Sequence, residues 1–305
     1  MNFNLVINQI LVLFIIIFIG YILRKKNHID EKLNKGLSRL LVEITMPALI
    51  ISSMNIQIDS GLITNIQLIS FITIILYVFL IIFGNLIFKN LSLPESKKKV
   101  FIFAIVFGNV GFMGYPVLES IYPELGIFYG VFNNIAFNIL LWTYGVYIYT
   151  SSSKNEGMKW KRLINNGTIA IAFGFLILFS GINLPVPISG AIDYLGDMTF
   201  PLSMLIIGSS LANIEFKNIF TDRYLILFSS IKLLFIPFLF LLGLKQFNLP
   251  EVVKNVNIIL LAMPSAANTV VFAERYDGDH NFASEVVFIT TLLSIFTIPF
   301  FVSLI

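Results

Sequence analysis

The pattern of apolar and polar positions divides the chain into ten long apolar stretches joined by short polar links. Most of these stretches approach the roughly 20 residues that an α-helix needs to cross about 30 Å of hydrocarbon. Helices are expected because lipid offers no partner for exposed backbone amides. The pattern therefore predicts ten membrane-spanning helices, near residues 5–23, 34–54, 66–88, 99–120, 127–149, 163–181, 190–211, 223–243, 253–273 and 282–302.

Composition supports a membrane location for the whole chain. Charged residues make up only 12% of the 305 residues, whereas a soluble domain has about 25%. A secretory signal peptide carries basic residues before its apolar run, but the first cation here, Arg24, follows that run. The first apolar stretch is therefore expected to remain as a span.

The positions of Lys and Arg predict the orientation in the membrane. All but Lys232, Lys245 and Lys254 of the 20 cations flank the links after odd-numbered stretches. Cytoplasmic links are enriched in Lys and Arg. The odd-numbered links are thus predicted to be cytoplasmic, with both termini outside the cell membrane. The net charge of +3 then reflects topology, and no nucleic-acid partner is expected.

Several chemistries lack the residues that they need. The chain has no Cys, and its two histidines, His28 and His280, lie in links, so neither a thiolate site nor a histidine metal site is expected. Motifs for cradling nucleotide phosphates, for zinc hydrolysis or for a nucleophilic serine are also missing from the sequence. We therefore expect no enzyme activity, no catalytic residues, no metal and no cofactor.

The two halves of the chain resemble each other. The segment "EITMP" at 43–47 recurs as "DMTFP" at 197–201, and at the same offset the five apolar stretches of one half align with those of the other. Because five is odd, the second copy must cross the membrane in the opposite sense, as in the inverted repeats of many secondary transporters. The predicted fold is an all-α membrane protein of ten helices in two inverted five-helix repeats. The predicted parts are a first repeat at 1–149, a cytoplasmic connector at 150–162 and a second repeat at 163–305.

The fourth and ninth stretches both contain helix-breaking or polar residues near their centres. The fourth has "FGNVGFMGYP" at 107–116, and the ninth has "MPSAANTVVFAERY" at 263–276. Inverted-repeat carriers use discontinuous helices to place free backbone groups near the bilayer midplane, where they hold a ligand. The alternative is that Gly and Pro merely kink these helices and that Asn links neighbouring helices.

Three charged residues fall within predicted spans, where an unpaired charge is costly. Glu43 lies four residues after Arg39, a spacing that favours an ion pair on one helix face. Lys232 has no acid within one turn, and Asp197 is its candidate partner. Alternatively, Lys232 contributes positive potential to an anion path, and a buried carboxylate carries a coupling proton.

Several motifs together resemble the auxin efflux carrier family, which includes plant carriers and bacterial dicarboxylate permeases. These are "TMP" in the second stretch, "GNVGFMGYPV" in the fourth, "NNIAFNILLW" in the fifth and "MPSAANTVVFAERY" in the ninth. The resemblance covers nearly the whole chain and implies that helices four and nine cross at their broken centres, with an anionic substrate beside the crossing. Two differences from the plant proteins are Thr269, where they have a second proline, and the short central link.

The resemblance and the breaks together give the expected substrate site. Asn109 matches the asparagine of the family's fourth-helix motif, and Asn138 resembles a polar substrate-site position in the fifth helix. The full expected set is Gly108, Asn109, Gly111, Pro116, Asn134, Asn138, Pro264, Ser265, Asn268 and Thr269, with Glu43, Asp197 and Lys232 as the intramembrane charges.

The resulting functional hypothesis is a secondary transporter that moves a small organic anion by alternating access. The substrate would be a mono- or dicarboxylate, auxin-like or similar to malate or malonate. Two alternatives stay open at this point, a sodium-coupled organic-anion symporter of the bile-acid type and a receptor or channel-like protein without transport. The expected partners are the organic anion, the lipid bilayer and a second copy of the chain in a homodimer.

Overall fold

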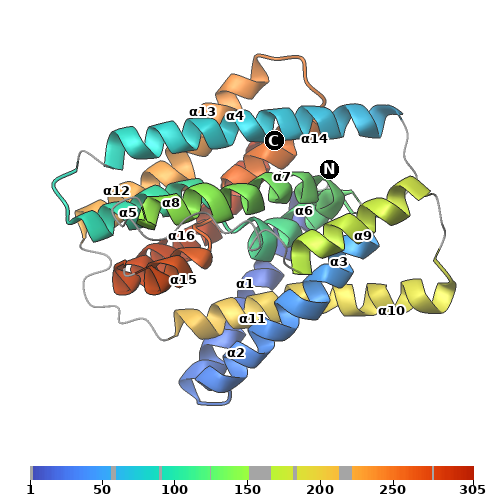
Figure 1. Cartoon of the computed structure of the whole chain (residues 1–305), viewed down its shortest axis with the longest axis horizontal. Helices are drawn as coiled ribbons and strands as arrows, with labels where there is room; N and C mark the ends of the chain where they lie inside the picture. Colours follow the sequence, from blue (N-terminus) through green and yellow to red (C-terminus); the bar gives the residue numbers. More distant parts are fainter. Residues whose placement is uncertain are drawn as a thin grey trace. The chain divides into compact units, whose positions relative to one another are not determined.

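The described chain is built from helices (Figure 1). The computed structural model describes residues 3–55, 60–88, 91–123, 125–150, 166–180, 184–212, 222–276 and 278–305. Two compact units are present, and each draws on both halves of the sequence. The first comprises Met1–Ile66, Gly111–Phe132 and Leu163–Asn213, and the second comprises Gln67–Val110, Asn133–Arg162 and Ile214–Ile305.

The first unit contains eight complete helical elements and the beginnings of two helices that continue in the second unit. The elements are α1 (Phe3–Lys25), α2 (Glu31–Leu40), the π-helical turn η1 (Leu41–Thr45), α3 (Met46–Ser53), α6 (Tyr115–Ile121), α9 (Asn166–Ser180), α10 (Val186–Asp197) and α11 (Thr199–Leu211). The two continuing helices are α4 (Ser60–Phe88) and α7 (Gly126–Leu140). The predicted connector at 150–162 lies, apart from Thr150, outside the described residues.

The second unit holds the rest of α4 and α7 and most of the C-terminal half of the chain. Its further elements are α5 (Glu95–Val106), the π-helical turn η3 (Leu141–Gly145), α8 (Val146–Thr150), α12 (Arg223–Ser230), the π-helical turn η5 (Ile231–Phe235), α13 (Ile236–Lys245), α14 (Glu251–Leu261), α15 (Asn268–Arg275) and α16 (His280–Leu304). A further π-helical turn, η2 (Val110–Gly114), begins at Val110, the last residue of this unit's first segment, and its remaining residues belong to the first unit.

Long apolar helices confirm the membrane character of the chain. Within the described residues, five helical runs are long and apolar enough to cross a membrane, and they coincide with the predicted second, third, fifth, eighth and tenth spans. They are Glu31–Ser53, Gly61–Phe88, Gly126–Thr150, Arg223–Lys245 and His280–Leu304. The predicted fourth and ninth spans are each divided into two helices. The inverted relation between the two halves stays a prediction.

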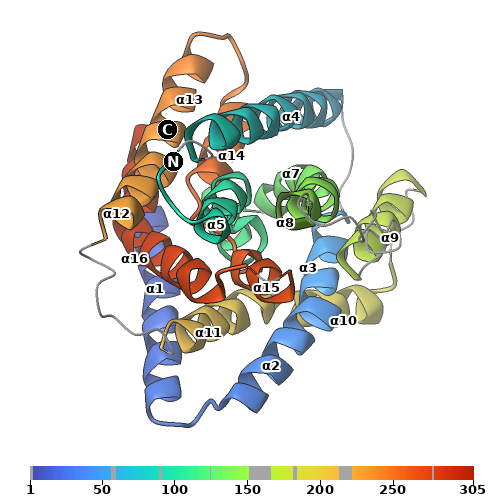
Figure 2. The same cartoon turned by 60° about the vertical axis from the view of Figure 1, so that its left-hand side comes forward.

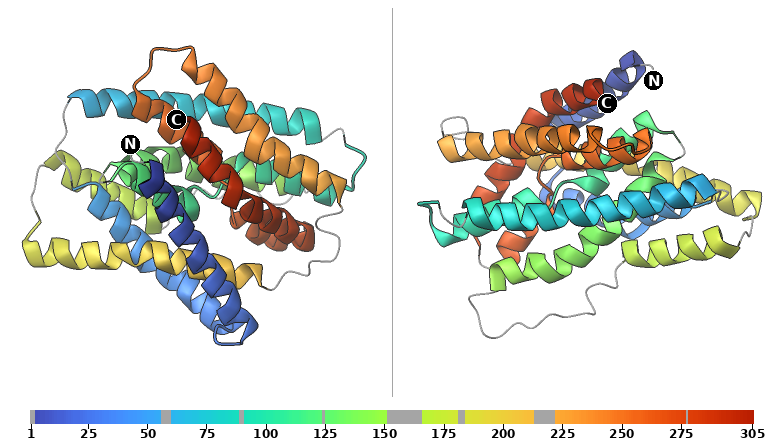
Figure 3. Two further views of the ribbon diagram at one scale, coloured as in Figure 1. Left: turned by 180° about the vertical axis from the view of Figure 1, so that it is seen from behind. Right: turned by 90° about the horizontal axis from the view of Figure 1, so that it is seen from above.

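Close backbone approach organises the first unit. Helix α1 crosses α11, as seen from behind in Figure 3. A Cβ atom at Gly208 would lie 1.8 Å from the carbonyl oxygen of Ile17, so only glycine permits this contact. Small residues at helix interfaces are the usual device in membranes, because packing rather than water exclusion holds such helices together.

Aromatic packing organises one end of the second unit. The ring of Phe101 in α5 stacks on Phe228 of α12 at a centroid distance of 4.7 Å, and meets Phe282 of α16 edge-on at 5.0 Å. Figure 2 shows α5, α15 and α16 gathered in this region. Each aromatic pair contributes about 0.5–1.5 kcal/mol beyond its buried area. The cluster holds α5 against the C-terminal helices α12 and α16.

Candidate substrate site

Two interrupted helices meet in the second unit. Helix α5 ends at Val106, and α14 ends at Leu261 before α15 begins at Asn268. The intervening segments are extended and antiparallel, with Gly108 opposite Ser265. The amide of Ala266 donates to the carbonyl oxygen of Phe107 at 2.9 Å. The crossing of the fourth and ninth segments, expected from the sequence, is therefore present.

The crossing satisfies backbone groups that the broken helices leave free. The amide of Asn109 donates to the carbonyl oxygen of Pro264 at 2.7 Å. Proline has no N–H and cannot continue a helical ladder, and an unpaired backbone group is expensive away from water. Each interruption thus supplies partners for the other, which explains how two broken helices remain stable inside a membrane protein.

Ser265 forms hydrogen bonds from the crossing to the helices α16 and α5. Its amide donates to the hydroxyl of Thr290 in α16 at 3.2 Å, and its own hydroxyl donates to the carbonyl oxygen of Ala104 in α5 at 3.3 Å. The Ser265 side chain is completely buried. Through these two hydrogen bonds Ser265 stabilises the backbone of the predicted site.

A lysine lies next to the crossing that residues 107–109 form with residues 264–266. Lys232 belongs to the π-helical turn η5, and only 2% of its surface is exposed. Its amino group donates to the carbonyl oxygen of Ile105 at 3.0 Å, in the last turn of α5. The C-terminal end of a helix carries a partial negative charge that favours a cation. No carboxylate in the described part of the second unit forms an ion pair with Lys232.

Gly108 makes room for this lysine. A Cβ atom at Gly108 would lie 3.5 Å from Nζ of Lys232 and 3.6 Å from the carbonyl oxygen of Leu260. These are ordinary contacts for a methyl group, but a larger side chain would meet both atoms. The glycine therefore lets the extended backbone pass directly over the amino group.

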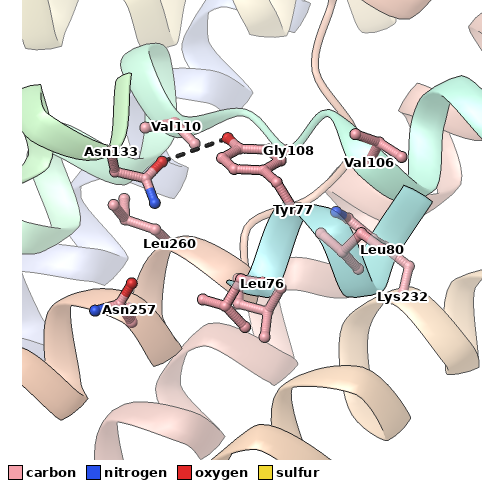
Figure 4. Close-up of a pocket in the computed structure, with 11 residues that line it drawn as sticks. Leu76, Tyr77, Leu80, Val106, Gly108, Val110, Asn133, Lys232, Asn257 and Leu260 are labelled. Atoms are coloured by element: carbon pink, nitrogen blue, oxygen red, sulfur yellow. Dashed lines mark hydrogen bonds between the residues drawn. The ribbon is translucent and has the colours of Figure 1, made fainter. Parts of the chain in front are cut away.

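A small cavity extends from Lys232 below the crossing. Its remaining lining includes Gly108, Tyr77, Asn133, Asn257 and several aliphatic side chains. Figure 4 shows Lys232 and Asn257 at opposite ends of this lining, with Tyr77 between them. The space open to the centre of a water molecule is about 20 Å³, and a single water needs about 10–15 Å³ by this measure. In this conformation the cavity is too small for an organic anion.

The structure brings some of the predicted asparagines together and leaves others without partners. The side-chain amide nitrogen Nδ2 of Asn138 donates to Oδ1 of Asn134, one turn earlier, at 3.1 Å. Asn109 is 7% exposed, and its side chain has no hydrogen-bond partner among the described residues. At the start of α15, Asn268 is half-buried, while Thr269 is fully buried and its hydroxyl has no partner in the described chain.

Two residues expected within the break of the fourth span lie instead in helix. Gly111 falls in η2 and Pro116 in the first turn of α6, both in the first unit. The π-helical turn η2 runs directly into α6, and Gly114 at their junction has helical backbone angles, so the helix continues through Pro116. The interruption therefore lies at residues 107–109, and Pro116 follows it inside the resumed helix.

The other two predicted intramembrane charges also belong to the first unit. Nε of Arg39 donates to Oε1 of Glu43 at 2.9 Å, which confirms the ion pair that their spacing predicts. Asp197 is the last residue of α10 and is exposed. Its pairing with Lys232, which belongs to the other unit, stays a prediction.

Four lining or supporting residues were missed by the sequence interpretation. Tyr77, Asn133 and Asn257 line the cavity, and Thr73 contacts both asparagines through its hydroxyl. Their signal in the sequence is one polar residue or a polar pair within an apolar run, as in "VNIILL" around Asn257 and "VFNNIAF" around Asn133. Such residues are expected to face other helices, because polar groups facing lipid are costly.

Comparison with known proteins identifies the family of the chain. The profile of the family described as "Membrane transport protein", the auxin efflux carrier family, matches residues 5–161 and 153–302. The chain belongs to this family. An uncharacterized transporter of Methanocaldococcus jannaschii is 26% identical over 299 residues, covering 95% of each chain. An uncharacterized transporter of Methanothermobacter thermautotrophicus is 25% identical over 296 residues, again covering 95% of each chain. The resemblance seen in the sequence motifs is thereby confirmed, and this membrane transport protein is a multi-pass membrane protein.

Proposed function

We propose that this membrane transport protein is a secondary carrier that moves a small organic anion by alternating access. The observation that carries the proposal is Lys232, a buried cation beside the crossing with no ion-paired carboxylate in the described part of its own unit. The hydrogen bond of its amino group goes to an uncharged acceptor, the carbonyl oxygen of Ile105 at the end of α5. A protonated lysine in such a place lacks a full counter-charge.

An anionic substrate would supply that charge. Transfer of an ammonium group out of water costs several kcal/mol, and a carboxylate close to it recovers much of this cost because the surroundings have a low dielectric constant. The lysine would thus attract mono- or dicarboxylates and reject cations. Neutral compounds of the same shape would gain nothing from the charge.

Amide donors near the crossing would orient the anion. The side chain of Asn109 is buried without a hydrogen-bond partner among the described residues, and an amide nitrogen can donate two hydrogen bonds. Asn138 and Asn134 form a second amide group on α7. Hydrogen bonds to a charged group contribute about 1.5–3 kcal/mol each, which is enough to select an anion by shape as well as by charge.

Alternation between two accessible states fits the small volume of the cavity. About 20 Å³ is open to water beside Lys232, so substrate entry requires a different conformation. Inverted-repeat carriers move largely by displacing one helical bundle against another, and this chain has two compact units. We place both termini outside the cell membrane, as the distribution of Lys and Arg indicates.

The test is uptake of labelled anions into proteoliposomes that contain the purified chain. A panel of mono- and dicarboxylates is offered with and without a proton or sodium gradient, next to neutral amides of the same carboxylates. The proposal predicts saturable uptake of at least one acid and none of its amide. Uptake that requires sodium would identify the bile-acid type of symporter, and anion binding without uptake would identify a receptor. Either result would overturn the proposed mechanism.

A further inference from the structure

A buried chain of hydrogen bonds connects three helices next to the cavity. The hydroxyl of Tyr77 donates to Oδ1 of Asn133 at 3.5 Å, and Nδ2 of Asn133 donates to the hydroxyl of Thr73 at 3.2 Å. That hydroxyl donates to Oδ1 of Asn257 at 3.1 Å, and Nδ2 of Asn257 donates to the carbonyl oxygen of Val253 at 2.9 Å. Helices α4, α7 and α14 contribute the members.

The carbonyl oxygen of Val253 fixes the direction of the whole chain. A carbonyl oxygen can only accept, so the amide of Asn257 must present its nitrogen to Val253 and its oxygen to Thr73. The single proton of the Thr73 hydroxyl is then used on Asn257, and this hydroxyl must accept from the nitrogen of Asn133. The Asn133 oxygen consequently faces Tyr77.

This order leaves hydrogen-bond donors for a ligand. Each amide nitrogen has two N–H groups, and one on Asn133 and one on Asn257 stay uncommitted within the described chain. Both amide oxygens are already engaged, by Tyr77 and Thr73 respectively. Asn133 and Asn257 line the same cavity as Lys232. The groups left for a ligand in this cavity are therefore predominantly donors.

We propose that Asn133 and Asn257 form a subsite for acceptor oxygens of the transported anion, and that Thr73 is the positioning residue that orients both amides. This inference rests on the proposed function. Thr73 is 0% exposed and does not line the cavity, so it acts through the two asparagines. With the Thr73 hydroxyl present, an amide rotation that turned an oxygen toward the ligand would leave unpaired buried groups, which are costly. The subsite thereby selects anions and disfavours metal cations, which need oxygen ligands.

The experiment compares Thr73→Val with Thr73→Ser in the proteoliposome uptake assay. Valine has nearly the shape of threonine but no hydroxyl, while serine keeps the hydroxyl. We expect Thr73→Val to raise the apparent KM for the anion about ten-fold with little change in maximal rate, and Thr73→Ser to keep most of the affinity. Thr150→Val is the matched control, because the Thr150 hydroxyl only donates to its own helix at Val146.

A double-mutant cycle tests whether Thr73 acts through Asn257. Asn257→Leu removes one of the two donors that Thr73 orients, so adding Thr73→Val to it should raise the apparent KM by a smaller factor than Thr73→Val does in the parent. Multiplication of the two single effects would contradict a positioning role. The same four proteins are then compared by the shift that the anion causes in the melting temperature of each purified protein. This shift reports binding of the anion independently of its transport.

The outcomes separate the subsite from the proposed function. If the parent transports an anion and Thr73→Val has the parent's KM, the subsite is wrong and the carrier stands. Failure of the parent to transport or bind any anion would overturn both. If Thr73→Val does not fold, Asn257→Leu with an unchanged KM and an unchanged melting-temperature shift would by itself overturn the subsite.

Discussion

The amino group of Lys232 donates a hydrogen bond to the carbonyl oxygen of Ile105 at 3.0 Å, so a cation from the π-helical turn η5 rests on the last turn of the interrupted helix α5. This contact joins the lysine to one of the two helices that form the crossing. Burial of such a group without a full counter-charge opposes stability. We infer that the positive charge of Lys232 binds the substrate. Removal of this charge is therefore expected to lower transport without lowering the stability of the fold.

Replacement of Lys232 by methionine is expected to leave folding intact and to abolish most transport. Methionine fills a similar volume without the charge, and apolar replacement of buried charges is often neutral or stabilising by about 1 kcal/mol or more. The melting temperature should therefore be unchanged or higher, while anion uptake falls about 10–100-fold because a charge-assisted contact is lost. Lys245→Met is the matched control, since Lys245 is exposed and donates to the carbonyl oxygen of Leu304. Full uptake by Lys232→Met would contradict the proposed role.

A charge exchange distinguishes the substrate from Asp197 as the partner of Lys232. If the anion supplies the counter-charge, Asp197→Asn should leave the yield of folded protein within about two-fold of the parent. The exchanged variant, with Asp at 232 and Lys at 197, should then be no better folded than Lys232→Asp alone. The readout is the monodisperse peak in size-exclusion chromatography. Rescue by the exchange would show that the two residues pair, as the sequence also allows.

Loss of the Asn109 side chain is expected to affect affinity more than stability. Its side-chain amide has no hydrogen-bond partner in the described chain, so Asn109→Ala, which keeps the backbone bond to Pro264, should change the unfolding free energy by less than about 1 kcal/mol. If the amide donates to the anion, the apparent KM should rise about ten-fold. Pro116→Ala serves as the comparison, because Pro116 lies in the resumed helix α6 and its change should leave KM near the parent value. Equal KM values for the parent and Asn109→Ala would remove Asn109 from the site.

The two breaks could be predicted from the sequence because they depend on local chemistry, since Pro264 and Gly108 each disturb a helix. That the breaks cross was implied by the resemblance to the family. The extent of the break was harder to predict. Gly111 and Pro116 were included in it, yet a π-helical turn followed by a proline in the first turn of α6 keeps this part helical. A count of helix-breaking residues does not reveal which of them the backbone accommodates.

The residues around Lys232 could be predicted only in part. Its isolation from nearby acids in the sequence was visible, whereas its contact with Ile105 depends on how two distant segments pack. Thr73, Asn133 and Asn257 come from three helices, and nothing in their own stretches indicates that they contact one another. Their hydrogen-bond order follows from the geometry at Val253. Sequence patterns report neighbours along the chain, and these partners are neighbours only in space.

The predicted orientation can be tested directly because the chain has no cysteine. His28 follows α1 and Asn248 follows α13, and both are exposed. If both termini are outside, a cysteine introduced by His28→Cys should react with a membrane-impermeant maleimide only after permeabilisation. One introduced by Asn248→Cys should react in intact cells. The reverse labelling pattern would show that both termini are on the cytoplasmic side and would contradict the predicted orientation.

Counterflow is the measurement that tests the central claim most directly. Proteoliposomes are preloaded with an unlabelled anion that the chain transports, and the same labelled anion is added outside at a low concentration. An alternating-access carrier exchanges one for the other, so label should accumulate transiently above its outside concentration in the parent and in Lys245→Met, but not in Lys232→Met. Label that only equilibrates in the parent, or that accumulates equally in Lys232→Met, would contradict a carrier that uses Lys232 to bind its anion.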